Sequence, residues 1–534
     1  MGEIGLHLAG GGQVSIRGWL RWVVGATAAT LLVISVPHIL EAPGWSAGVN
    51  FAYLALGVYW LSATLSFLSA ERTQPSRGNW VLWGVSVVVV HVLALSVPHL
   101  AEGEGWLTGE KCIYLTLVAY LGAAALYFSF AGLQEAQLRL GAMKLARSGL
   151  LLHTLAIVGR WASSGHAPLS DTYEMLLAFS WGLVMLLEIA EWRLKLPSLG
   201  AFLVPLAALA LVLLQVLPSE IRVLVPEMQS LWLHLHVVLA VLSYMGITLA
   251  FALAVFYLTK DGMALRSFLS WTAALVLGVY AAIVATSMNS HLALLVPTWA
   301  WSNGRQEQVM MGPREALEAP IEALGYPFVM VLALAGVTLA LNLLATLSVS
   351  GERWEKLARR TFWAAIVMQV LALGLFMFEV ETGLYYAPQY GESYEMHLGA
   401  SPFLLAGVVG ALFVSLAWEA LAWKYDSIVA CLPEGGRLDG IIYKIVGISF
   451  GLLTLMFVTG AYWANHAWGK LWTWDPKVIW ALITWFTYAG YMDLRLTRGW
   501  RGRRMAYIAI AGFGIMMFTF LGVTYLLRGL HAYI

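Results

Sequence analysis

The sequence carries little charge and almost no cysteine. Of its 534 residues, 11% are charged and 60% are hydrophobic. Soluble domains carry roughly a quarter charged residues, so this composition excludes an ordinary soluble protein. A net charge of +1 provides no basic surface for a nucleic-acid partner. With only two cysteines and no CxxC pair, the chain also gives no sign of thiol redox chemistry or of a cysteine-bound metal.

Apolar runs recur along the whole chain, each long enough to cross roughly 30 Å of hydrocarbon as a helix. A transmembrane β-barrel would instead show weak alternation in segments of about ten residues. The sequence therefore predicts an all-α polytopic membrane protein with about 15 transmembrane helices. We expect these at 18–37, 51–69, 80–98, 112–131, 147–161, 172–190, 198–217, 232–258, 268–287, 326–347, 362–380, 402–422, 443–463, 479–494 and 506–527.

The distribution of lysine and arginine predicts the orientation, because these residues accumulate on the cytoplasmic side. With a cytoplasmic N-terminus, 23 of the 31 Lys and Arg residues fall in cytoplasmic segments, including the run RLTRGWRGRR (495–504). An odd number of spans then places the C-terminus outside. Cys112 and Cys431 fall at opposite faces and cannot pair. The first span lacks a small-residue cleavage site and is expected to be retained.

One internal repeat is readable near the N-terminus. SVPHILEAPGW (35–45) recurs as SVPHLAEGEGW (96–106), each at the outer end of an expected span. A period that covers one helix hairpin indicates tandem duplication, so residues 1–135 are predicted to form a four-helix module. His38 and His99 are equivalent within it. Each either ends a helix at the interface or serves as a ligand or contact point for a partner.

Three histidines are expected at similar depth on the outer side of the membrane. His236 begins a span that enters from outside, His531 follows a span that ends outside, and His466 lies in an outer loop. Histidine near hydrocarbon is costly and suggests a functional site. Imidazole is also the usual axial ligand of haem iron.

The outer loop with His466 belongs to the stretch WANHAWGKLWTWDPKVIWALITW (463–485), which contains six of the 25 tryptophans. Asp475 and the proline after it are a good helix start, and an interfacial aromatic belt explains only some of the tryptophans. A flat aromatic surface suits a planar ligand of the porphyrin type, whose carboxylates Lys470 and Lys477 could meet. The candidate binding residues are His236, His466, Trp468, Trp472, Trp474, Asp475, Trp480 and His531.

These stretches resemble a known family. The tryptophan stretch is similar to the WWD signature of the haem-handling cytochrome c biogenesis proteins, in the form of the CcsA or ResC type. Four further stretches resemble that type: GRWASSGHAPLSDTYEMLLAFSWG (159–182), MQSLWLHLHVVLAVLSYMGI (228–247), LDGIIYKIVGISFGLLTL (438–455) and LGVTYLLRGLHAYI (521–534). The resemblance covers about 148–266 and 433–534.

The resemblance implies a role in cytochrome c maturation. It implies b-type haem as substrate, bound at the outer face with His236 and His531 as axial ligands to the iron, against the WWD surface. Together with a ResB/CcsB-type membrane partner, such a protein presents haem to the CxxCH motif of apocytochrome c, as part of a cytochrome c synthase (haem lyase). The implied location is the inner membrane of a bacterium, with the site facing outside.

The resemblance also implies a division of the chain and two alternatives. Residues 136–266 and 433–534 would form a CcsA-like core, and 267–432 would be inserted membrane helices with two outer loops, the first containing a short surface helix near 313–324. One alternative is a haem chaperone or exporter subunit without ligase activity. The other is a membrane transporter or a b-haem electron-transfer subunit.

Two positions depart from the family pattern. Val478 stands where relatives often have glutamate. Asp493, in YMDLRLTR, stands where they usually have a histidine that is thought to help bind a second haem during export. Aspartate is a poor haem ligand, so the usual route of haem export is in doubt. His91, His153 or a partner could substitute.

Overall fold

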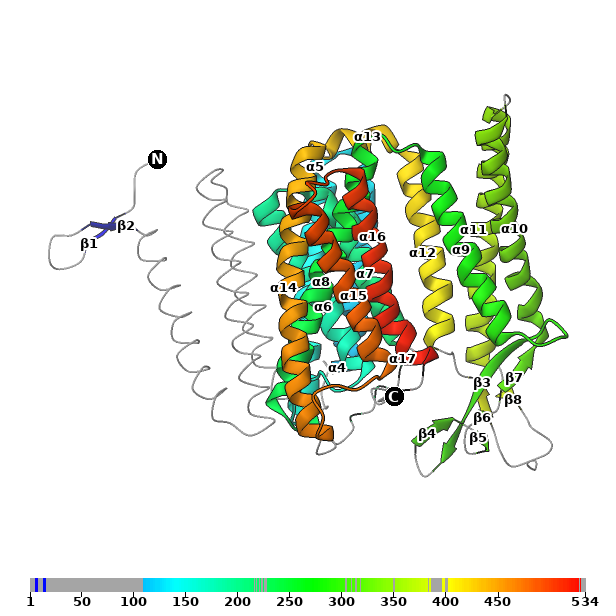
Figure 1. Cartoon of the computed structure of the whole chain (residues 1–534), viewed down its shortest axis with the longest axis horizontal. Coiled ribbons are helices and arrows are strands. Elements are labelled where there is room, and N and C mark those ends of the chain that lie inside the picture. The colour runs from blue at the N-terminus through cyan, green and yellow to red at the C-terminus, as the bar shows by residue number, and fades with distance from the viewer. Residues whose placement is uncertain are drawn as a thin grey trace.

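The computed structural model describes most of the chain after residue 108 (Figure 1). Before that point it describes only β1 (Gly5–His7) and β2 (Gln13–Ser15), an antiparallel pair. The expected spans at 18–37, 51–69 and 80–98, with the two repeated motifs, lie outside the described residues. After residue 108, the positions not described are 216, 218, 220, 222–223, 225–227, 303–304, 309, 313–314, 317, 349–350, 383, 386–395, 399–401, 528 and 530–534.

Long helices dominate the described part, as the apolar runs predict. They are α4 (Gly109–Leu133), α5 (Ala136–Ser164), α6 (Thr172–Leu194), α7 (Gly200–Leu214), α8 (Leu231–Lys260), α9 (Leu265–Ser287), α10 (Glu322–Leu347), α11 (Gly351–Thr382), α12 (Pro402–Trp423), α14 (Gly435–Trp468), α15 (Pro476–Leu496) and α16 (Arg503–Met517). Two short helices, η1 (Pro197–Leu199) and α13 (Tyr425–Cys431), precede α7 and follow α12.

Ten of the helices in the described residues are long and apolar enough to cross a membrane. The two remaining long helices, α5 and α15, cover the expected spans at 147–161 and 479–494. Every expected span between 112 and 527 therefore coincides with a helix. The prediction of an all-α polytopic membrane protein is confirmed for the described part of the chain.

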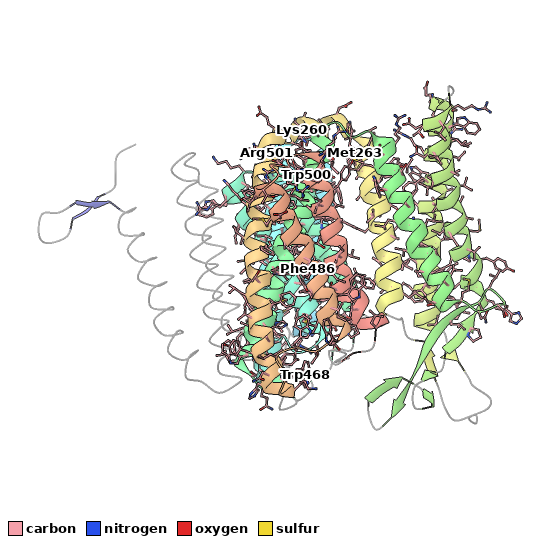
Figure 2. All side chains as sticks on the ribbon, viewed as in Figure 1. Lys260, Met263, Trp468, Phe486, Trp500 and Arg501 are labelled. Carbon is pink, nitrogen blue, oxygen red and sulfur yellow. The ribbon has the colours of Figure 1, made fainter. Side chains whose placement is uncertain are left out.

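The loops between these helices separate by charge. Consecutive long helices run in opposite directions, so that alternate loops lie at the same end of the bundle (Figure 1). Lys260 and Arg501 are at one end, and Trp468 is at the other (Figure 2). The basic loops expected on one side of the membrane are thus gathered at one end in space.

Helix α8 lies at the centre of the main bundle and packs along α14 and α16. Ser243 of α8 donates a hydrogen bond to the carbonyl oxygen of Ser449 in α14, at 2.9 Å. On the side of α16, the rings of Phe251 and Phe513 are stacked with centroids 4.0 Å apart. Inside a membrane the hydrophobic effect does not drive helices together, so their association depends on close packing, which small residues and stacked rings allow.

Helix α16 does not end as a regular α-helix. It continues into a π-helical turn, η4 (Phe518–Gly522), and then into α17 (Val523–Leu526). Thr519 in this turn donates to the carbonyl oxygens of Trp480, at 3.1 Å, and Ile515, at 2.9 Å. Such turns are frequent at functional sites, because the extra residue changes which side chains face a neighbour.

Helices α9 to α12 stand beside the main bundle (Figure 1). They share a second apolar core in which Leu269 of α9, Phe362 of α11 and Trp418 of α12 are buried. The same helices also contribute to the main core through residues such as Tyr280 and Phe328. This part of the chain is therefore packed against the main bundle and not only tethered to it.

The two loops that follow α9 and α11 meet in one small sheet. Strand β3 (Leu294–Ser302) pairs antiparallel with β4 (Arg305–Gln308), β7 (Glu318–Ile321) and β9 (Met396–Leu398), and β9 pairs with β8 (Leu384–Tyr385). A second pair, β5 (Met310–Gly312) and β6 (Glu315–Ala316), lies within the first loop.

The short surface helix expected near 313–324 is wrong. Strands β6 and β7 take up Glu315–Ala316 and Glu318–Ile321, and helix α10 begins only at Glu322. The glutamates and alanines favour a helix locally, but Pro320 breaks one. Pairing also buries Ile321 opposite Leu294. Tertiary pairing overrides helix propensity here.

At the basic end, a buried ion pair joins α14 to the α15–α16 turn. Both carboxylate oxygens of Asp439 accept from Arg495, at 3.0 and 2.7 Å, and the N–H of Gly502 donates to Asp439 at 3.0 Å. The two side chains are only 12% and 11% exposed. Arg495 also donates to the carbonyl oxygen of Trp500 at 3.1 Å.

We expect Asp439→Asn to destabilise the fold, because it leaves the Arg495 guanidinium buried without its counter-charge. Breaking one partner of a buried pair costs about 3–5 kcal/mol. Thermal unfolding of the purified protein in detergent should show a clearly lower Tm. Asp426→Asn, at an exposed position on α13 near the same end, is the control and should leave Tm unchanged. Equal melting of the two variants would contradict this role for Asp439.

Candidate functional site

A cleft opens at the end of the bundle away from the basic loops. It lies between α8, α14, α15 and the π-helical turn η4, and Leu169 and Ser170 before α6 and Met228 before α8 also contribute. The cleft holds about 1130 Å³ of space free of protein atoms, counted with the solvent at its mouth. Its lining is mainly apolar and aromatic, with a few polar side chains, which is typical of cofactor and small-molecule sites.

His236 reaches the cleft from the second turn of α8. Its Nδ1 lies 2.8 Å from the carbonyl oxygen of Met456 in α14. Because a carbonyl oxygen can only accept, Nδ1 carries the proton and the lone pair of the neutral ring is on Nε2. Histidines that ligate metals usually donate their other ring N–H in this way, which fixes the tautomer and the ring orientation.

Gly460 and Trp463 complete the seat of the His236 ring. A Cβ at position 460 would lie 2.6 Å from Nδ1 of His236, so only glycine leaves room for the imidazole there. Trp463 is 2% exposed, and its ring is nearly parallel to that of His236, with centroids 6.5 Å apart and an interplanar angle of 19°. Met456, Gly460 and Trp463 are spaced by four and three residues and therefore share one face of α14.

The tryptophans between residues 463 and 480 divide into two groups. Trp463, Trp468 and Trp472 line the cleft, and Trp468 packs edge-on against Trp463 with centroids 4.8 Å apart. Trp474 and Trp480 do not line it. Trp474 is 78% exposed and meets the edge of Trp472, whereas Trp480 packs on Phe518 with centroids 4.4 Å apart.

Asp475 organises the chain next to the cleft. As expected, it caps α15, with Oδ1 accepting from the backbone N–H of Lys477 at 3.0 Å. Its side chain is 5% exposed and lies against Gly529, where any Cβ would collide with Oδ2. The Lys477 ammonium donates to Thr524 of α17 at 3.1 Å. These contacts fasten the segment after η4 to the start of α15.

The other predicted site residues are placed as follows. The prediction that His466 lies in a loop is wrong, because α14 continues to Trp468; His466 is exposed in its last turn and does not line the cleft. Lys477 lines the cleft, whereas Lys470 is exposed and does not. His531 lies outside the described residues. The structure thus brings His236, Trp468 and Trp472 together in one cleft.

Sequence reasoning missed several lining residues. Trp463, Gly460, Met456, Tyr244 and Phe520 all line the cleft but were not among the candidates. Trp463 is the first residue of the tryptophan stretch, and its place there is the signal that identifies it. The roles of Gly460 and of the Met456 carbonyl depend on how α14 meets α8, which no motif in the sequence indicates.

Asp493 and His153 both lie apart from the cleft. Asp493 is exposed, and the hydroxyl of Thr497 donates to its Oδ1 at 3.2 Å. His153 is completely buried in α5, with Nδ1 3.3 Å from the hydroxyl of Tyr120, and it does not line the cleft.

The sequence of this chain is similar to those of known proteins. The model of the Cytochrome C assembly protein family matches residues 327–531, a continuous range that includes α11, α12, α14 and α15. A cytochrome c biogenesis protein CcsA of Trichormus variabilis is 29% identical over 444 residues, which cover 82% of this chain and 99% of the relative. The CcsA of Synechococcus elongatus is 50% identical over 102 residues, 19% of this chain and 31% of that protein.

A third relative is matched over nearly its whole length. The CcsA of Nostoc punctiforme is 30% identical over 442 residues, with coverage of 82% of this chain and 99% of its own length. The chain belongs to the CcsA family of cytochrome c biogenesis proteins, and it is a multi-pass membrane protein of that family.

Proposed function

We propose that the cleft binds haem at the outer face of a bacterial inner membrane and presents it for covalent attachment to apocytochrome c. The observation that carries this proposal is the environment of the His236 ring. Its Nδ1–H is held by the Met456 carbonyl, the ring lies against Trp463, and the cleft beside it is apolar and aromatic. A neutral imidazole with a fixed tautomer suits axial ligation of iron.

His531 would supply the second axial ligand. It lies outside the described residues, but Gly529, two residues earlier in the chain, lies against Asp475. Gly529 therefore lies beside the WDPK stretch, which is about fifty residues earlier in the sequence and contributes Lys477 to the cleft. This contact supports the proposal that the C-terminal histidine and His236 serve the same bound molecule.

The cleft walls fit the two kinds of surface that haem presents. Trp468 and Trp472 offer aromatic faces and edges to the porphyrin plane. Lys477 is the cationic side chain in the lining and could meet a haem carboxylate. Trp474, Asp475 and Trp480 would act around this core: Asp475 by fixing the start of α15, Trp480 by packing on Phe518, and the exposed Trp474 at the outer surface. His466, which is exposed outside the cleft, has no role in this proposal.

The chemistry itself would require little of this chain. Each thiol of a CxxCH motif adds across one haem vinyl group, so that sulfur bonds to one vinyl carbon and a proton goes to the other. The addition balances without an oxidant, and the nucleophiles belong to the substrate. This chain would hold the iron, orient the vinyl edge and release one ligand as the substrate histidine takes its place. A ResB/CcsB-type membrane protein is the proposed partner.

Two parts of the chain would have different roles, one forming the cleft and the other a contact surface. In this proposal the cleft belongs to the core formed by 136–266 and 433–534, since its lining comes from those two ranges. Residues 267–432 carry the outer sheet and would present a surface to the client or to the partner.

His236 is the proposed axial ligand of the haem iron. We expect His236→Ala to remove most of the haem absorption of the purified protein and, on co-expression with a CxxCH apocytochrome and the partner, most of the covalent product. His466→Ala is the matched control, because it changes an exposed histidine outside the cleft. Covalent haem measured by a peroxidase stain after denaturing electrophoresis gives the answer. Full maturation by His236→Ala would overturn the assignment, and haem binding without attachment in the native protein would favour a chaperone role.

Gly460 leaves the space that the imidazole ring of His236 occupies. Gly460→Ala places a methyl group against the imidazole, so we expect a shifted haem spectrum or a loss of haem. Gly451→Ala is the control on the same helix, because a Cβ there meets no atom within 4 Å. Absorption spectra of the two variants, normalised to protein, make the comparison. Identical spectra would show that His236 does not depend on Gly460.

A further inference from the structure

Arg160 and Glu174 form a buried ion pair next to the cleft without lining it. Arg160 is near the end of α5, and Glu174 is in the first turn of α6. The Arg160 Nε donates to Glu174 Oε1 at 2.7 Å, and the two side chains are 10% and 1% exposed. A buried pair of this kind seldom increases stability over apolar packing, so its value lies in fixing geometry.

The second oxygen of Glu174 holds the loop between the two helices. Oε2 accepts from the backbone N–H of Ser170 at 2.8 Å and from its hydroxyl at 2.6 Å. Ser170 and its neighbour Leu169 line the cleft. Hydrogen bonds to an ionised carboxylate are shorter and stronger than neutral ones. One carboxylate therefore fixes this part of the cleft mouth.

Arg160 also bonds to the backbone of a second residue near the cleft, Ser219. One terminal nitrogen of its guanidinium donates to the carbonyl oxygen of Ser219 at 2.7 Å, in the segment between α7 and α8. That segment also supplies Met228 to the cleft lining. The guanidinium lies over the ring of Tyr173, 4.6 Å from its centroid. A single buried cation thus links both outer segments that border the cleft.

We propose that Arg160 is a positioning residue that holds Leu169 and Ser170 at the cleft mouth and so limits the exchange of molecules between the cleft and solvent. The proposal rests on the proposed function only for the identity of the bound molecule as haem. The position of the loop can be measured without haem.

The first experiment measures exposure of the loop. Leu169→Cys is introduced into the full chain, with Cys112 and Cys431 replaced by serine, and labelled in membranes with an impermeant maleimide. Arg160→Gln should speed labelling roughly tenfold or more, since it removes the charge-assisted hydrogen bonds to Glu174, which holds Ser170, and to the Ser219 carbonyl. Arg147→Gln is the matched control, because Arg147 pairs with Glu188 of α6 at 2.8 Å far from the loop.

The second experiment measures exchange at the cleft. Added imidazole should replace an axial ligand of oxidised haem faster in Arg160→Gln than in the native protein or in Arg147→Gln. Arg160→Lys should give an intermediate rate, because it keeps the charge beside Glu174. Ser170→Ala, which removes only the hydroxyl donor, should give a smaller increase in the labelling of Leu169→Cys.

Equal labelling of Leu169→Cys in the Arg160→Gln and Arg147→Gln backgrounds would overturn the proposal. Faster labelling with an unchanged imidazole rate would overturn the part that concerns exchange. If the native protein carries no haem at all, the proposed function fails, while the labelling result still decides whether Arg160 positions the loop.

Discussion

The packing of α8 against α14 is the contact on which the site depends. It is made along the length of both helices, with Ser243 bonded to the backbone of Ser449 near the middle. Nearer the outer end, the same contact brings His236 to the Met456 carbonyl and to the space left by Gly460. A rigid helix pair is a better support for a ligand than a loop, because the side-chain geometry is set by the whole interface.

Much of the fold could be predicted from the sequence. Each expected span from 112 to 527 is a helix, because apolar length and charge placement follow directly from what a bilayer requires. The outer sheet could not be predicted in the same way. Strand β3 pairs with β9, about a hundred residues further along, and such pairing depends on where α10 and α11 place the two loops. The residues near Pro320 have helical composition but join this sheet.

The candidate site could be predicted in part. His236, Trp468 and Trp472 share a cleft, as reasoning from topology and motif expects. Trp474 and Trp480 belong to the same motif but point elsewhere, since a run of tryptophans in a loop and a helix start cannot all face one side. Gly460 and the Met456 carbonyl carry no recognisable signature. Their roles arise from backbone proximity between two helices that are more than two hundred residues apart.

The π-helical turn η4 has a consequence for how this family can tolerate length changes. A π-turn arises when one extra residue is accommodated inside a helix. A residue added to or removed from a regular α-helix rotates everything after it by about 100°, given 3.6 residues per turn. The π-turn absorbs one extra residue locally, so that Thr524 and Gly529 keep their contacts with Lys477 and Asp475. A length change of one residue at 518–522 is therefore compatible with these contacts, whereas the same change in the regular part of α16 would break them.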